Sequence, residues 1–129
     1  MTVLLGGDTC AVLTVWMAAW QLQCCGAAFS VGDTVEWTLA PVDDPDAITA
    51  GIGRELAETV THSEDHHGLL LPDDAPRTNG TVRSIRAIDG GRESATAPAI
   101  VTAVSSANGW EPNHDGARFA GYLIELDAP

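Results

Sequence analysis

The second half of the sequence is a succession of short β-type segments separated by turn signals. The segments TVRSIRAI (81–88), APAIVTAVSSA (97–107) and FAGYLIEL (119–126) are rich in β-branched and aromatic residues, which favour strands. Gly90–Gly91 and NGWEPNHDG (108–116) lie between them, and such glycine- and asparagine-containing stretches are typical of turns. Short strands at this spacing predict a mainly β domain, a small antiparallel barrel-like or sandwich fold.

The first half adds two more expected strands. Residues 13–22 carry β-branched and aromatic side chains at the density of a strand, and CCG (24–26) would close that strand. In residues 34–39 apolar and polar side chains alternate after a Gly32–Asp33 turn, which indicates a half-buried strand. Because Gly6–Gly7 interrupts the N-terminal residues, we expect an extension over 1–12 and a single domain over 13–129.

One short helix is expected between residues 41 and 60. Ile48, Ile52 and Leu56 recur every four residues, and Asp46 stands where a capping side chain would begin the helix. The polar residues that follow, from 61 to 80, are rich in Asp, Pro and His and predict a long loop.

The charge and hydropathy of the chain limit the kinds of partner that it can bind. The chain has 18 acidic residues against 6 basic ones, all scattered arginines, and a net charge of −12. Such a surface repels the phosphate backbone, so we expect no nucleic-acid partner. No basic residue precedes Arg54, which excludes the positive start of a signal peptide, and the apolar run 10–20 is too short to cross a bilayer. We therefore expect a cytoplasmic protein with no membrane partner, and its three cysteines, which cannot all pair, suit a reducing compartment.

The vicinal pair Cys24–Cys25 leaves three interpretations open. In an extended chain one thiol would enter the core and the other would face outward, with no chemistry at all. Alternatively, either cysteine could join His62, His66 and His67 in a transition-metal site, and thiolate with imidazole is the ligand set that zinc prefers. A third reading is a thiol enzyme in which His66 or His67, oriented by Asp65, activates a cysteine.

Four tryptophans account for most of the aromatic residues. For Trp16 and Trp37 we expect core packing. Trp110 lies in a loop beside Gly109 and Pro112, and Trp20 precedes the cysteine pair, so these two are candidate contacts for a ligand or a protein partner.

Three blocks of the chain resemble a small actinobacterial family of unknown function. They are WQLQCCGAAFSVGDTVEWTL (20–39), the His66–His67 pair followed by NGTVRSIRAI (79–88), and GWEP (109–112) ahead of RFAGYLIELD (118–127). The resemblance covers about residues 13–127 and brings no established activity. We expect a non-catalytic binding or interaction module that self-associates as a homo-oligomer, through an apolar strand or the N-terminal segment. The zinc-type metal protein and then the thiol enzyme are the alternatives.

Overall fold

The computed structural model describes residues 11–25, 27–44, 52–65, 71–72, 74–90, 99–112 and 118–128. Its elements in chain order are β1 (Ala11–Ala18), α1 (Ala19–Cys25), β2 (Phe29–Ser30), β3 (Thr34–Trp37), β4 (Leu39–Pro41), α3 (Arg54–Ala57), β5 (His62–Glu64), β6 (Thr78–Gly90), β7 (Ile100–Val104), β8 (Ser106–Ala107) and β9 (Arg118–Ala128). The prediction of a mainly β fold is confirmed.

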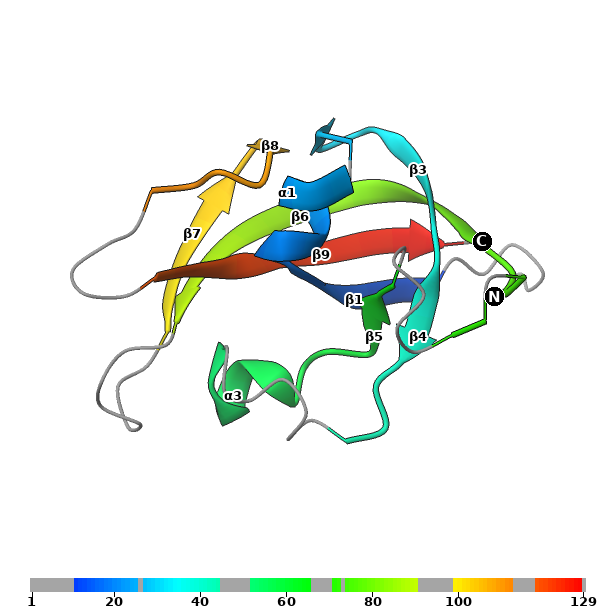
Figure 1. Cartoon of the computed structure of the whole chain (residues 1–129), viewed down its shortest axis with the longest axis horizontal. Helices are drawn as coiled ribbons and strands as arrows, with labels where there is room; N and C mark the ends of the chain where they lie inside the picture. Colours follow the sequence, from blue (N-terminus) through cyan, green and yellow to red (C-terminus); the bar gives the residue numbers. More distant parts are fainter. Residues whose placement is uncertain are drawn as a thin grey trace, which may run out of the picture.

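Seven strands form one mixed sheet that curls into a half-barrel (Figure 1). Six of them follow the order β3-β6-β9-β1-β5-β4, and β7 pairs with the far end of β6. All neighbours are antiparallel except β1 and β5, which run parallel. The chain passes from β3 to β4 through the single residue Thr38, although these strands lie at opposite ends of that order. This short connection draws the two ends of the sheet together and explains the curl.

The two faces of the sheet carry separate hydrophobic cores. Along β1, Val15 and Met17 face one core whereas Trp16 faces the other, as the two-residue period of a strand requires. The inner cluster lies within the curl and contains Val15, Met17, Leu22, Phe29, Leu39, Val82, Ile85, Ala87, Ala107, Tyr122, Ile124 and Leu126. The outer cluster contains Trp16, Ile52, Ala57, Val60, Ile88 and Leu123. In Figure 1, α1 lies on one side of β1 and β9 and α3 on the other.

The prediction of one strand over residues 13–22 is wrong for residues 19–22. β1 covers residues 11–18, and α1 begins at Ala19. Ala, Leu and Gln favour helix, and Ala19 and Leu22, three residues apart, are both buried. The sequence therefore changes from a two-residue to a helical period at this point. Cys24 and Cys25 end the helix, so the premise that the pair lies in an extended chain is also wrong.

Residues 29–41 contain the predicted turn at Gly32–Asp33 and the predicted half-buried strand that follows it. Asp33 N donates to Ser30 O at 3.0 Å, and Gly32 between them has φ +95°, a value that favours glycine. The side chains of Val35, Trp37 and Leu39 then pack with the inner cluster. Thr38 interrupts the strand, so that one predicted strand is two, β3 and β4.

The second helix, α3, covers Arg54–Ala57, so the fold has two short helices in the described residues and not one. Ile52 and Leu56 pack with the outer cluster, as their spacing predicted. Asp46 and Ile48 lie outside the described residues. Residues 62–64, predicted as loop, form β5, because β1 and β4 offer it a partner on each side. No helix within the described ranges is long and apolar enough to span a membrane.

Candidate functional site

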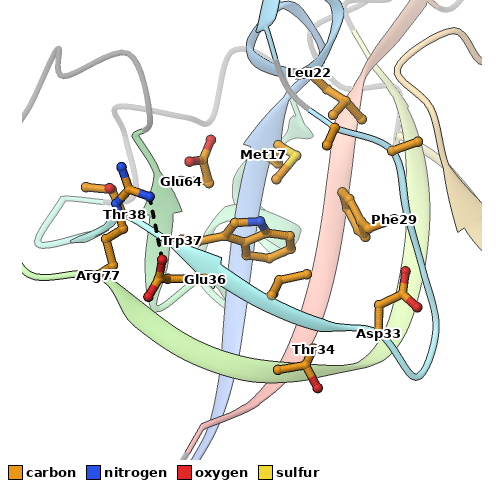
Figure 2. Close-up of a pocket in the computed structure, with 13 residues that line it drawn as sticks. Met17, Leu22, Phe29, Asp33, Thr34, Glu36, Trp37, Thr38, Glu64 and Arg77 are labelled. Carbon is orange, nitrogen blue, oxygen red and sulfur yellow. Dashed lines mark ion pairs between the residues drawn. The ribbon is translucent and has the colours of Figure 1, made fainter.

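A pocket of about 570 Å³ opens where α1, β3 and β5 meet (Figure 2). It is lined by Met17, Leu22, Ala27, Ala28, Phe29, Asp33, Thr34, Val35, Glu36, Trp37, Thr38, Glu64 and Arg77. We call it the half-barrel pocket. Its volume falls within the range of about 300–1,000 Å³ that suits a small organic ligand.

Aromatic and aliphatic side chains form one side of the half-barrel pocket. The rings of Phe29 and Trp37 meet edge to face, with centroids 5.0 Å apart and planes inclined by 71°. In Figure 2 the indole of Trp37 lies beside Met17 and Phe29. Phe29 and Met17 are buried in the inner cluster, so this side of the pocket is held rigidly by the core.

Polar groups line the rest of the half-barrel pocket. Arg77 Nη1 lies 3.6 Å from Glu36 Oε1, and both side chains are more than half exposed. The Asp33 carboxylate accepts a hydrogen bond from Ser30 N at 2.8 Å, which holds it at the turn before β3. Glu64, in contrast, is only 2% exposed. Three carboxyl groups and one guanidinium thus line a pocket with an aromatic wall.

The alternation of apolar and polar residues along β3 gives the half-barrel pocket both its apolar and its polar side chains. Val35 and Trp37 are half-buried, whereas Thr34 and Glu36 are exposed. β3 pairs with β6 in a register that sets Glu36 opposite Asn79, two residues after Arg77. The ion pair of Arg77 with Glu36 therefore depends on the register between β3 and β6.

A second polar cluster joins α1 to the segment before β9. Gln23 Nε2 donates to Gly109 O at 2.7 Å, and Gly109 N donates to the Tyr122 hydroxyl at 3.0 Å. That hydroxyl donates in turn to Glu111 Oε2 at 3.0 Å. Burial of Tyr122 raises its pKa to about 12, and the Glu111 carboxylate adds to the increase. These bonds fix the end of α1 and the loop at Gly109 against the inner cluster.

The candidate contact residues Trp20 and Trp110 lie on the surface near this cluster. Trp110 is 69% exposed and Trp20 is 45% exposed. Trp20 stands three residues before Gln23 on α1, and Gln23 bonds the residue before Trp110. The structure thus connects α1, which carries both Trp20 and the cysteine pair, to the loop of Trp110. Trp16 is buried, as expected, whereas Trp37 is half-buried and lines the half-barrel pocket.

The metal-site candidates are only partly described. Cys24 and Cys25 end α1, but their side chains, like His66 and His67, lie outside the described residues. His62 lies in β5, where burial lowers its pKa and its Nδ1 is 2.9 Å from Thr61 Oγ1. Among the described side chains, no group of three or more His, Cys, Asp or Glu is placed to hold a metal ion.

The model of a family of unknown function, DUF6578, matches residues 11–128. The chain belongs to this family. The match spans β1 to β9, so every described element of this DUF6578 protein falls within it. No curated protein and no solved structure matches the chain.

Sequence reasoning missed the pocket of this DUF6578 chain, though one signal pointed to it. The alternation in 34–39 correctly set Trp37 on the inward face. That Phe29 would meet Trp37, and that Arg77 would pair with Glu36, depended on contacts between distant segments. Such contacts follow from strand order and register, which a single sequence does not display.

Proposed function

We propose that the protein is a small binding module that acts by holding a small organic ligand in the half-barrel pocket. The observation that carries the proposal is the lining of that pocket. A rigid aromatic and aliphatic side faces a few polar groups, which is the composition of small-molecule sites in general.

The pocket proposal is tested by ligand-observed NMR with a set of aromatic and aliphatic fragments. We expect wild-type protein to bind several of them with millimolar or better affinity. Ala28→Trp, at an exposed lining position, fills the pocket without opening the core, and we expect it to abolish binding. Trp110→Ala is the control, because Trp110 lies outside the pocket lining, and it leaves binding unchanged. Equal binding by the Ala28→Trp and wild-type proteins would overturn the proposal.

We further propose that two copies associate through β7. Within the described residues β7 pairs with β6 alone, and Val101, Thr102 and Ala103 are exposed along it. Residues 99–110 contain no charged side chain, in a protein whose net charge is −12. Two strongly acidic copies repel each other least along such an uncharged strand, and an edge strand offers backbone groups for pairing. Antiparallel pairing of β7 with its copy would give a two-fold dimer.

We also propose a cytoplasmic location, an actinobacterial source and a partner contact at Trp110. The cytoplasm remains the proposed compartment, because three cysteines cannot all pair. An actinobacterial source is supported by the composition, which is rich in Ala, Gly and Asp and lacks lysine. Trp110 remains a proposed partner contact because of its exposure beside α1.

A further inference from the structure

The charges around the half-barrel pocket are unbalanced. Among the described lining residues, Asp33, Glu36 and Glu64 contribute carboxyl groups, and Arg77 contributes the single cation. That cation lies 3.6 Å from Glu36, which offsets its charge. The exposed Asp33 then leaves the open side of the pocket with an excess of negative charge.

We propose that the ligand of the half-barrel pocket is a small organic cation, an ammonium group carried on an apolar body. The inference rests on the proposed function, since it names the ligand class of the same pocket. The apolar body would pack against Met17, Phe29 and Trp37, and the ammonium group would lie toward the carboxylates on β3 and its preceding turn.

The aromatic wall favours a cation for a second physical reason. The face of an aromatic ring is negative, and indole attracts cations more strongly than phenyl does. Trp37 is half-buried and in edge-to-face contact with Phe29, so its ring is held in a fixed orientation at the pocket wall. A quaternary or alkylated ammonium, which is weakly hydrated, loses little on leaving water for such a site.

The net charge of the whole protein also favours a cationic ligand. With a net charge of −12, the molecule raises the local concentration of cations and lowers that of anions. An anionic ligand would need a cationic anchor, and Arg77, the only basic residue among the described lining residues, is already in contact with Glu36. The pocket is therefore matched in charge to a cation.

The test compares three probes of nearly the same shape and different charge. Benzyltrimethylammonium is cationic, neopentylbenzene is its neutral isostere, and benzylsulfonate is an anion of similar size. Each is titrated into the full chain at moderate ionic strength and followed by protein-observed NMR. We expect the cation to bind roughly tenfold more tightly than the neutral isostere, and the anion to bind most weakly.

Charge-neutralising variants test whether the preference for a cation comes from the carboxylates at the pocket. Asp33→Asn/Glu36→Gln removes two negative charges at the pocket and is expected to lower cation affinity roughly tenfold while leaving the neutral isostere unaffected. Glu55→Gln/Glu58→Gln removes two negative charges from the region of α3, which lies on the other face of the sheet. This matched control changes net charge equally, and we expect less than a twofold loss of cation affinity.

The outcomes separate this inference from the function on which it rests. Tighter binding of the cation, lost in the pocket variant and kept in the control, supports it. If the neutral isostere or the anion binds as tightly as the cation, the cation inference is wrong and the pocket proposal stands. Equal losses in the two variants would also overturn it, because the preference would then come from overall charge. If neither charged probe binds at millimolar concentration and the neutral isostere does not bind up to its solubility limit, the proposed function itself fails.

Discussion

Tyr122 is the residue whose burial has the clearest consequence in solution. Its ring packs edge to face with Phe119 at 5.0 Å, and its hydroxyl connects Gly109 to Glu111. Removal of that hydroxyl would leave buried polar groups to be satisfied elsewhere, at a cost of about 1–3 kcal/mol. One tyrosine thus holds the loop that carries Trp110.

The raised pKa of Tyr122 predicts a loss of stability at alkaline pH. The unfolded chain ionises this tyrosine near pH 10.0, whereas the folded protein keeps it protonated to about pH 12. Between these values the unfolded state binds fewer protons, so the free energy of unfolding falls as pH rises, by up to about 2–3 kcal/mol. We expect Tyr122→Phe to be less stable at pH 8 but to lack this additional decline.

The measurement is unusually direct because the chain has one tyrosine and no lysine. Ultraviolet absorbance of tyrosinate during alkaline titration reports Tyr122 alone, and denaturant unfolding at the same pH values gives the stability. A tyrosinate midpoint near 10.0 in protein that is still folded would contradict the buried hydroxyl.

Gly121 marks a close approach of β9 to β1. It lies opposite Ala18 in the antiparallel pairing of β9 with β1, and an added Cβ would collide with the Met17 carbonyl oxygen and lie 2.8 Å from the Trp16 ring. Because the obstacle includes backbone, Gly121→Ala should lower the free energy of unfolding by about 2–4 kcal/mol. Gly32→Ala is the control: its Cβ would meet nothing within 4 Å, and only the positive φ of +95° opposes it, at about 1 kcal/mol.

Denaturant unfolding of both glycine variants checks this packing. Similar losses in the two proteins would show that β1 and β9 do not approach as closely as the structure has them.

At the scale of elements, the local residue pattern predicted the strands correctly more often than it predicted the boundaries between a strand and a helix. β6, β7 and β9 were all expected, because each repeats β-forming residues over several positions. The start of α1 at Ala19 was missed, since Trp16 and Trp20 made one continuous strand plausible. β5 was missed because three polar residues, 62–64, carry no strand signal by themselves. Their strand conformation comes from pairing with Val15 and Trp16 on β1 and with β4.

α1 and β5 also bear on the metal alternative, because they carry the cysteine pair and His62. The metal hypothesis predicts stoichiometric zinc in protein purified without a histidine tag, and its loss in Cys24→Ser/Cys25→Ser. Elemental analysis of both proteins provides the readout, with His114→Ala as a control outside the candidate ligand set. Metal-free wild-type protein from zinc-supplemented cells would remove the hypothesis.

At the scale of the whole molecule, the sequence predicted a mainly β fold class, but it did not predict the strand order by which the sheet curls into a half-barrel. The order β3-β6-β9-β1-β5-β4 interleaves strands from both halves of the chain. Spacing along the chain gives no access to that order, and the half-barrel pocket exists only because of it. The inward face of Trp37 could be predicted, but not that a pocket would open beside it.

The β7 proposal predicts a concentration-dependent dimer. Multi-angle light scattering should show dimer increasing with protein concentration and with salt, which screens repulsion between acidic copies. Thr102→Lys, exposed on β7, should shift the protein to monomer, because its charge meets the same charge across the two-fold axis. Thr81→Lys, exposed on β6 at its other end, changes net charge equally and should leave the dimer intact. Wild-type protein that stays monomeric at high concentration and high salt would rule out the proposal.

The most direct test of the central claim is where a bound probe lies. In the complex with benzyltrimethylammonium, intermolecular nuclear Overhauser effects should connect the protons of the probe to the indole of Trp37 and the methyl group of Met17, which both line the half-barrel pocket. The indole signal is assigned with Trp37→Phe. Contacts confined to Trp110, or to any surface away from Trp37 and Met17, would contradict the half-barrel pocket as the binding site.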